Sequence, residues 1–231
     1  MLQGQQAIWI ASAMTAGDRE RADAAEEAGE TLITPHGSGS RFKLRFVLPS
    51  PDAYNQYYNE ISNPLLWFLQ HYLWDTPRSP DITHETWKAW REGYVCVNQM
   101  FADEIIRACE AVDDEPIIML QDYHLYLCGN LIRERRPEAI IQHFIHIPWT
   151  QPDAWRVLPK RVRDEIYDGV LANDIVGFHT RSYRWNFLQC CRDLLGLDVD
   201  FGRGVVKWQD REVWVRAYPL PIDARAIQGV A

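Results

Sequence analysis

Three short apolar runs, each followed by polar residues and then by a helical stretch, constrain the fold of this 231-residue chain more than any other feature. The runs occupy residues 116–120, 140–145 and 174–178, and the helical stretches after the first and third extend to about Arg135 and Leu195. Short buried strands that alternate with helices form parallel sheets, because each parallel connection needs a crossover long enough for a helix. We therefore predict an α/β fold, a doubly wound parallel sheet with helices on both faces.

The remaining segments add strands and helices around this pattern. Residues 54–72 are rich in aromatic side chains, and the Asn63-Pro64 step predicts a break into two short helices, because proline has no backbone N–H. Thr180 is the expected cap of the helix after the third run. The other predicted elements are strands at 7–11 and 41–47, a surface helix or mobile insertion at 18–30, a core-facing helix at 84–111, and a hairpin with strands at 205–208 and 213–218. No internal repeat or linker divides the sequence, so a single domain is expected.

The charge and the cysteine content exclude several classes of protein. A net charge of −8 argues against a nucleic-acid partner, whose phosphates require a basic face, although it leaves room for a phosphorylated small molecule. The five cysteines show no framework spacing, which indicates reduced thiols in a cytoplasmic protein. No signal peptide opens the sequence and no run of roughly 18 apolar residues is present, so we expect a soluble protein without a membrane partner.

The polar residues directly after the apolar runs are the candidate ligand contacts, since ligands of an open parallel sheet bind beyond the carboxyl ends of its strands. Asp122 follows the first run, and its carboxylate is suited either to accepting hydrogen bonds from sugar hydroxyls or to capping the next helix. Position alone leaves both interpretations open. His146 follows the second run and is a stronger candidate than His124 or His179, although a lone histidine at a strand end is more often structural.

Common metal, nucleophile and cofactor sites do not fit this sequence. His143 and His146 are three residues apart in a predicted strand, where they face opposite sides and cannot bind one metal ion together. A Gly-x-Ser-x-Gly nucleophile motif and a Gly-x-Gly-x-x-Gly dinucleotide motif are both missing from the sequence. The Gly-Ser loop at 35–40 lacks the lysine of a P-loop. We therefore predict neither a metal nor a cofactor.

Seven short segments stand in the same order as the motifs of a known family. They are Tyr-Tyr-Asn-Glu-Ile-Ser-Asn-Pro-Leu-Leu-Trp at 57–67 with His71-Tyr72, Trp-Arg-Glu-Gly-Tyr-Val-Cys-Val-Asn at 90–98, Asp-Tyr-His-Leu at 122–125, His-Ile-Pro at 146–148, Val-Leu-Pro at 157–159, Asp-Ile-Val-Gly-Phe at 174–178, and Tyr218-Pro219 with Ile222-Asp223. Together they resemble the trehalose-6-phosphate synthase family over residues 7 to 223. One tetrapeptide alone is a weak indication, whereas seven segments in order are a strong one.

This resemblance implies a fold, a reaction and a set of site residues. Members of the family are retaining glycosyltransferases in which two Rossmann-like domains face a cleft, the B-type glycosyltransferase fold. The N-terminal domain binds glucose 6-phosphate as the acceptor, and the C-terminal domain binds a nucleoside diphosphate sugar as the donor. Matched by motif, Tyr58 contacts the acceptor phosphate, Trp67 and Trp9 line the acceptor pocket, Asp122 holds acceptor hydroxyls, and His146 binds the donor sugar.

The resemblance also implies which part of such an enzyme the chain represents. We expect residues 1–231 to form a single Rossmann-like acceptor-binding domain, without the family's first strand and without its C-terminal donor domain. The expected partners are a sugar phosphate acceptor, a nucleoside diphosphate sugar donor bound through a second domain, and further copies of the chain in a homo-oligomer. On this basis the chain alone is expected to be inactive.

Several positions depart from the family pattern and leave the acceptor open. Gln121 stands where the family has histidine, Trp149-Thr-Gln follows the His-Ile-Pro segment, and Pro221 replaces a glycine. The leading interpretation is transfer of glucose from a nucleoside diphosphate glucose to glucose 6-phosphate. A related glucosylglycerol-phosphate or cyclitol-phosphate type of transferase, or a non-catalytic sugar-phosphate-binding subunit, remains an alternative.

Overall fold

In the computed structural model, the described residues are 7–30, 32–34, 42–73, 81–112 and 116–221. The Gly-Ser loop at 35–40 and the Ile222-Asp223 dipeptide named above lie outside them. All five cysteines are described and none forms a disulfide. Among these residues, no helix is both long enough and apolar enough to cross a lipid bilayer.

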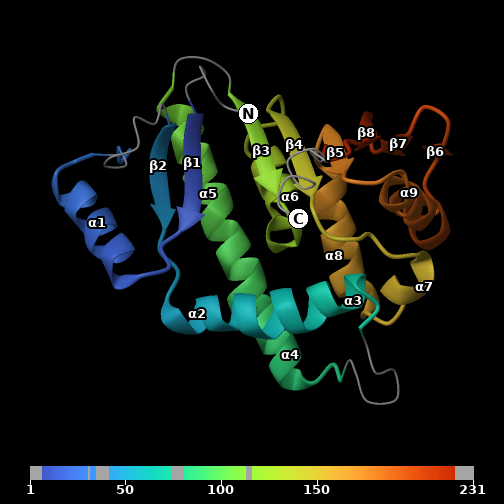
Figure 1. Ribbon diagram of the computed structural model, residues 1–231, viewed down its shortest axis with the longest axis horizontal. Coiled ribbons are helices and arrows are strands. Elements are labelled where there is room, and N and C mark those ends of the chain that lie inside the picture. Colours follow the sequence, from blue (N-terminus) through green and yellow to red (C-terminus); the bar gives the residue numbers. More distant parts are fainter. Residues whose placement is uncertain (1–6, 31, 35–41, 74–80, 113–115, 222–231) are drawn as a thin grey trace, which may run out of the picture.

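The described strands form two sheets (Figure 1). The larger sheet has the order β3-β4-β5-β8-β7-β6, in which β3, β4, β5 and β8 are parallel and the hairpin of β7 and β8 is antiparallel. Its strands are β3 (Ile117–Gln121), β4 (Ile140–Ile145), β5 (Ile175–Phe178), β6 (Val199–Asp200), β7 (Val205–Trp208) and β8 (Arg211–Ala217). The prediction that the three apolar runs form neighbouring parallel strands is confirmed, and so is the C-terminal hairpin.

The smaller sheet pairs β1 (Ala7–Ser12) with β2 (Phe42–Val47) in parallel, and helix α1 (Ala16–Glu27) connects them. Thr15 caps α1 in a capping box with Asp18, which explains where this helix begins. No residue of α1 is buried. Of the two interpretations of this charged segment, the surface helix is therefore the one that the structure adopts.

One face of the larger sheet is covered by the helices that join its parallel strands. These are α6 (Cys128–Arg133), α7 (Pro152–Trp155) with α8 (Lys160–Leu171), and α9 (Arg181–Leu195), and Thr180 caps α9 as predicted. Alternate strand residues point into the core beneath them, including Leu120, Ile141 and Val176. A cluster of stacked and edge-on rings fills the space between the helices and the sheet, formed by Trp149, Trp155, Tyr167, Phe178 and Phe187.

The opposite face of the same strands exposes apolar side chains. Ile117, Met119, Ile140 and Trp214 have exposed fractions of 65%, 52%, 53% and 45%. Strand register places Ile117 beside Ile140 on this face. We predicted helices on both faces of the sheet. The described helices cover only one face of these strands.

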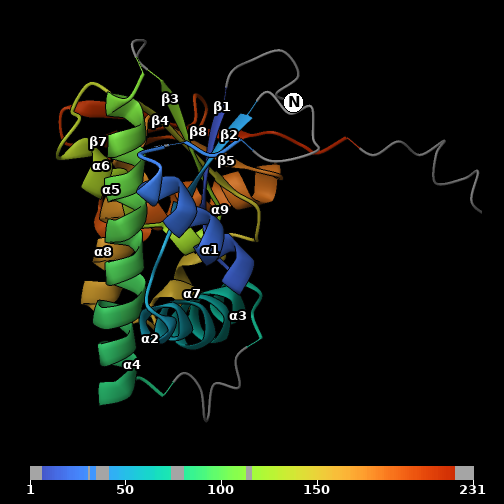
Figure 2. The ribbon, with the colours of Figure 1, turned by 90° about the vertical axis from the view of Figure 1, so that its left-hand side faces the viewer.

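Two long helical arms pack on each other; in Figure 2 the first lies below the sheets and the second rises alongside them. The first runs without interruption through α2 (Pro51–Asn55), the π-helical segment η1 (Gln56–Trp67) and α3 (Phe68–Gln70). The predicted break at Asn63-Pro64 is wrong. Pro64 lies inside the π-helical segment, whose hydrogen bonds reach one residue further back than those of an α-helix, as in the bond from Phe68 N to Asn63 O.

The second arm combines α4 (His84–Lys88), the π-helical segment η2 (Ala89–Val95) and α5 (Cys96–Glu110), in agreement with the predicted helix at 84–111. Gly93 sets how closely the two arms approach. A Cβ atom at this position would lie 2.5 Å from the backbone nitrogen of Tyr57 on the first arm. The absence of a side chain here lets residues of both arms reach the end of β3, where the candidate site lies.

Candidate active site

Asp122 directly follows β3 in a backbone conformation that residues other than glycine rarely adopt. Its φ and ψ angles are 64° and −178°. Such a conformation costs about 1–3 kcal/mol and persists only where surrounding contacts enforce it. Here Asp122 N donates to Phe144 O at 2.7 Å, and the Asp122 carbonyl accepts from His143 Nε2 at 2.9 Å. Strained residues of this kind concentrate at functional sites.

The carboxylate of Asp122 points along the sheet edge instead of capping a helix. A 3₁₀ turn, η3 (Tyr123–Leu125), begins at the next residue, but the Asp122 side chain makes no capping hydrogen bond to it. Oδ1 instead accepts a hydrogen bond of 3.2 Å from the backbone nitrogen of His146, at the end of the neighbouring strand β4. The capping interpretation is therefore wrong, and the prediction that Asp122 and His146 share one edge is confirmed.

A buried polar network holds the turn that follows Asp122. Tyr94 donates from its hydroxyl to the carbonyl of Tyr123 at 2.5 Å. The carbonyl of His124 accepts from Asn98 Nδ2 at 3.0 Å and from the Tyr57 hydroxyl at 3.3 Å. Burial raises the pKa of both Tyr94 and Tyr57, so their hydroxyls stay protonated and remain donors. The segment at 90–98 was recognised in the sequence without a role, and this network supplies one for Tyr94 and Asn98.

His146 follows β4, and its ring is held by two side chains, one from the end of each neighbouring strand, β3 and β5. Its Nε2 lies 2.9 Å from Gln121 Oε1, and its Nδ1 lies 3.1 Å from His179 Nε2. The carboxamide oxygen of Gln121 accepts from Nε2–H, which leaves Nδ1 of His146 to accept from His179. Burial lowers the pKa of His146; the Asp122 charge opposes this shift and His179 adds to it. The imidazole of His146 is therefore neutral near pH 7.

Sequence reasoning placed Gln121 and His179 at this edge but did not identify them as partners of His146. The aromatic ring of Phe144 supports the two histidines. The Phe144 ring lies 4.8 Å from the His146 ring and 4.9 Å, edge-on, from the His179 ring. Gly177 makes room for it, because a Cβ atom there would lie 2.8 Å from Phe144 Cδ2. The glycine of the Asp-Ile-Val-Gly-Phe segment is therefore explained by packing under the candidate site.

Tyr58 contacts the turn that follows Asp122, because its ring stacks on that of His124. The two rings are stacked with centroids 5.5 Å apart and planes 9° apart, and Tyr54 stacks on the other side of Tyr58 at 5.6 Å. Burial lowers the pKa of His124, so its imidazole is neutral. Among the described residues its Nε2 has no hydrogen-bond partner. Tyr58 thus stands beside the turn that follows Asp122.

The two tryptophans named in the sequence analysis have other ring partners. Trp67, at the end of η1, stacks on His71 with centroids 4.0 Å apart. Trp9, on β1, is 55% exposed and its ring lies 6.5 Å from that of Phe42. In the described ranges no hydrogen bond or ring contact joins either tryptophan to Asp122 or His146. Their roles in lining an acceptor pocket remain predictions.

The described residues contain no group of three or more histidine, cysteine, aspartate or glutamate side chains that could hold a metal ion. His143, as expected from strand alternation, points into the core, away from the edge where His146 lies. Burial lowers the pKa of His143 to about 4, and its Nε2 donates to the carbonyl of Asp122. It therefore acts as a neutral support for the strained turn.

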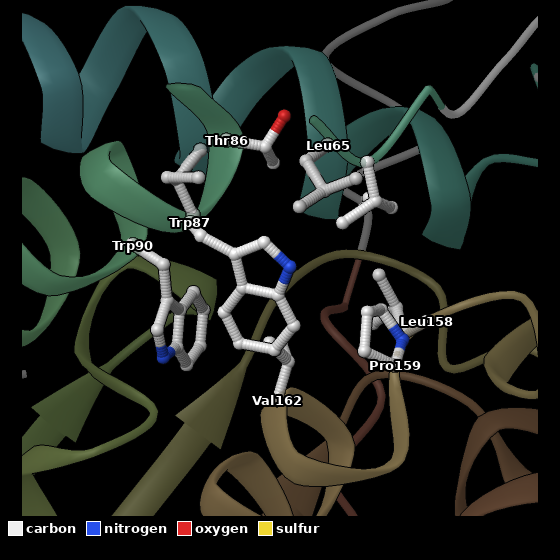
Figure 3. A pocket seen from close by; sticks show the side chains of 9 residues that line it. Leu65, Thr86, Trp87, Trp90, Leu158, Pro159 and Val162 are labelled. Carbon is white, nitrogen blue, oxygen red and sulfur yellow. The ribbon is translucent and has the colours of Figure 1, made fainter. Parts of the chain in front are cut away.

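A small gap between the helical arms and α8 is unsuited to a ligand (Figure 3). Its volume is about 10 Å³, and Leu65, Trp87, Trp90 and Val162 are among the residues that line it. A volume of this size holds at most one water molecule, and the lining is almost entirely apolar. The candidate active site is therefore the edge at Asp122 and His146.

Comparison with known proteins identifies the family. The model of glycosyltransferase family 20 matches residues 1–231, the whole chain. The chain belongs to glycosyltransferase family 20. This confirms the resemblance to trehalose-6-phosphate synthases, which are among the relatives of this family-20 chain.

Two curated relatives illustrate the range of the family. Validamine 7-phosphate valienyltransferase of Streptomyces hygroscopicus subsp. jinggangensis is 32% identical over 222 residues, which are 96% of this chain and 44% of that protein. UDP-forming alpha,alpha-trehalose-phosphate synthase 6 of Arabidopsis thaliana is 32% identical over 181 residues, 78% of this chain and 20% of that protein. The chain thus spans less than half the length of these relatives.

Solved structures share the fold. The N-terminal domain of Candida albicans trehalose-6-phosphate phosphatase superposes with a TM-score of 0.74 at 20% identity, covering 96% of this chain and 50% of that one. A UDP-forming trehalose-phosphate synthase from Burkholderia xenovorans gives a TM-score of 0.72 at 23% identity, with 96% and 49% covered. The family-20 chain is therefore one Rossmann-like half of a B-type glycosyltransferase fold.

Proposed function

We propose that the protein is a retaining glycosyltransferase that moves a sugar from a nucleoside diphosphate sugar to a phosphorylated acceptor, and that this chain supplies the acceptor half. Glucose is the leading donor sugar and glucose 6-phosphate the leading acceptor. Membership of family 20 supports the reaction class. The donor would bind through a second Rossmann-like domain, as in the B-type fold, so the chain alone is not expected to turn over.

The observation that carries this proposal is the joined pair of Asp122 and His146. One carboxylate and one neutral imidazole stand at the carboxyl ends of adjacent parallel strands, linked by the hydrogen bond from His146 N to Asp122 Oδ1. A carboxylate at this edge accepts hydrogen bonds from sugar hydroxyls, and bonds to a charged acceptor are the stronger kind. Tyr58, beside the same turn, is the proposed contact for the acceptor phosphate.

The reaction needs no protein nucleophile. The bond from the anomeric carbon to the leaving diphosphate breaks, and the acceptor oxygen bonds to that carbon on the same face. The acceptor proton passes to an oxygen of the leaving diphosphate, so atoms and charges balance. The protein's contribution is then to position the two substrates and to stabilise charge that develops in the transition state.

The neutral imidazole of His146 is the proposed contact for the donor sugar. Both of its ring nitrogens already have partners, Gln121 and His179. A sugar hydroxyl must therefore replace one of these partners when the donor binds. His179 Nδ1 is buried and has no hydrogen-bond partner among the described residues, so this side of the pair has unused hydrogen-bonding capacity.

A different phosphorylated acceptor is the first alternative. Gln121, which holds His146, stands where trehalose-6-phosphate synthases have histidine, and one relative with 32% identity is named for validamine 7-phosphate. Glycerol 3-phosphate or a cyclitol phosphate would use the same phosphate contact at Tyr58 while presenting different hydroxyls to Asp122. These acceptors therefore belong in every assay.

A non-catalytic sugar-phosphate-binding subunit is the second alternative. The occupied nitrogens of His146 favour it, since a residue locked between two partners supports binding without reaction. The two classes differ in one measurement. The full-length protein is incubated with nucleoside diphosphate glucoses and each phosphorylated acceptor, and the product is examined by NMR for the configuration at its anomeric carbon.

Formation of an α-linked product from an α-linked donor would support the proposed function. Saturable binding of a sugar phosphate without any product would favour the non-catalytic subunit. A product with inverted configuration, or transfer only to acceptors without phosphate, would contradict the proposal.

A further inference from the structure

An open pocket of about 420 Å³ lies between the start of α9, the turn from β6 to β7, and the end of β8. Pockets of this volume suit small molecules. Four of its six lining residues are arginines; the full set is Arg181, Arg184, Trp185, Arg203, Arg216 and Ala217. The chain as a whole carries a net charge of −8, so this concentration of positive charge does not reflect the general composition.

Arg184 is fixed by the backbone that surrounds it. Its Nε donates to Val215 O at 3.1 Å and its Nη2 donates to Phe201 O at 3.2 Å. Gly204 has a φ of 64° and leaves the space for this guanidinium, because a Cβ atom there would lie 2.0 Å from Arg184 Nη2. The β6–β7 turn is therefore shaped around the arginine.

Arg216 is fixed from the other side. Its Nη1 donates to the carbonyls of Arg203, Gly204 and Val215 at 3.0, 2.9 and 2.9 Å, and its guanidinium carbon lies 4.3 Å above the Trp214 ring. A guanidinium carries five N–H donors, and these three bonds use only one of its nitrogens. The carbonyl partners satisfy hydrogen bonds but do not neutralise its charge.

The charges of the pocket are not balanced by carboxylates. Within the described residues, Glu212 is the one carboxylate paired with any of the four arginines, at 3.2 Å from Arg203. Arg181, at the first position of α9, makes no hydrogen bond or ion pair with a described residue. Burial and the charge of Arg216 both lower the pKa of Arg184. The two positive charges of Arg184 and Arg216 therefore repel each other, and a bound anion would reduce this repulsion.

We propose that this pocket binds phosphate-bearing small molecules, at a site separate from Asp122 and His146. Three arginines without a carboxylate partner favour a ligand with more than one negative charge, which phosphate and diphosphate groups provide. Arginine is the side chain best matched to phosphate, since its planar fork forms paired charge-assisted hydrogen bonds. The N-terminus of the 15-residue helix α9 adds partial positive charge at the same place.

Titration calorimetry of the full chain with inorganic pyrophosphate tests this assignment. We expect one saturable site per chain. Arg181→Gln removes an exposed charge that supports no other contact in the described structure, and we expect it to weaken pyrophosphate binding by about fivefold or more. The matched control is Arg192→Gln, which removes another exposed charge from the last turn of the same helix, where it pairs with Asp193. This control should bind pyrophosphate as the unmodified chain does.

Two further comparisons make the outcome specific. His146→Gln should leave pyrophosphate binding unchanged, because the arginine pocket does not contain His146; a loss there would assign the binding to the candidate active site and overturn the proposal. Equal effects of Arg181→Gln and Arg192→Gln, or no saturable binding, would also overturn it. Inorganic phosphate and methyl phosphate then identify the source of the ligand: comparable affinities indicate phosphate esters, and binding of inorganic phosphate alone indicates the free ion.

Discussion

Replacing Asp122 by asparagine separates a role in catalysis from a role in structure. In the full-length protein, Asp122→Asn keeps the size and shape of the side chain but removes its charge. Hydrogen bonds to charged groups contribute about 1.5–3 kcal/mol, so the loss of one such bond in the transition state slows turnover by about 10- to 150-fold. The assay is initial-rate kinetics with the phosphorylated acceptor, measured together with the melting temperature.

The structure predicts that stability changes little in this variant. The bond from His146 N to Oδ1 of residue 122 is retained, because an amide oxygen also accepts it. Asparagine tolerates a positive φ about as well as aspartate, so the backbone at 64° is not further strained. Loss of the nearby negative charge lowers the pKa of His146 further, since Asp122 now raises it, and the imidazole stays neutral.

Two control variants sharpen the test. Asp164→Asn makes the same chemical change on the surface of α8, where Asp164 pairs with Lys160, and should alter neither rate nor melting temperature appreciably. Asp122→Gly removes the carboxylate, and glycine adopts the positive φ angle without strain. The relief of about 1–3 kcal/mol of strain offsets the loss of the hydrogen bond. We expect this variant to be inactive but nearly as stable as the unmodified protein. Near-normal turnover in Asp122→Asn would refute the catalytic assignment.

Three further predictions follow from the same geometry. The chain alone should show no transfer from any nucleotide sugar in a product-release assay, and robust turnover would reveal a donor site within it. Tyr58→Phe in the full-length protein should raise the KM for the phosphorylated acceptor more than it lowers kcat, and an effect confined to kcat would contradict the phosphate contact. Neutral His143 stabilises the fold above pH 6.5, and this contribution is lost as the pH falls from 6.5 towards its folded pKa of about 4. His143→Gln should therefore reduce the loss of unfolding free energy over that range by up to about 3 kcal/mol, which is measured as a smaller decline of the melting temperature. Identical pH profiles of the two proteins would show that His143 does not titrate there.

The parallel pairing of β3, β4 and β5 and the edge that carries the site were predictable from the sequence. Each apolar run was followed by a helical stretch, and the rule that ligands bind beyond the carboxyl ends of parallel strands selected Asp122 and His146. The structure brings both residues to the same edge, within one hydrogen bond of each other. The same rule also placed Gln121 and His179 there, but it could not say which side chains would bond, because strand register decides that.

Local sequence patterns could not predict the contacts between segments that are distant in the chain. The proline at position 64 predicted a break, yet the π-helical register accommodates it. The sequence pattern placed Tyr94 and Asn98 on a core-facing helix and assigned them no further role. In the structure they donate hydrogen bonds to the backbone carbonyls of Tyr123 and His124, which lie 29 and 26 residues further along the chain. Position alone also could not decide whether the Asp122 carboxylate caps the next helix; the hydrogen bond that it accepts from His146 N, in place of a capping bond, decided this.

The exposed apolar face of the larger sheet follows from its strand order. The chain moves from β3 to β4 to β5 to β8 in one direction, and right-handed crossovers then place α6, α8 and α9 on the same face. Helices for the opposite face of a doubly wound sheet come from strands that proceed the other way from its centre. The apolar runs have the continuous apolar composition of strands that are buried on both faces, since the exposed Ile117 and Met119 alternate with the buried Ile118 and Leu120. The pattern that made the parallel sheet recognisable in the sequence therefore describes a complete doubly wound domain, of which the described helices cover one face.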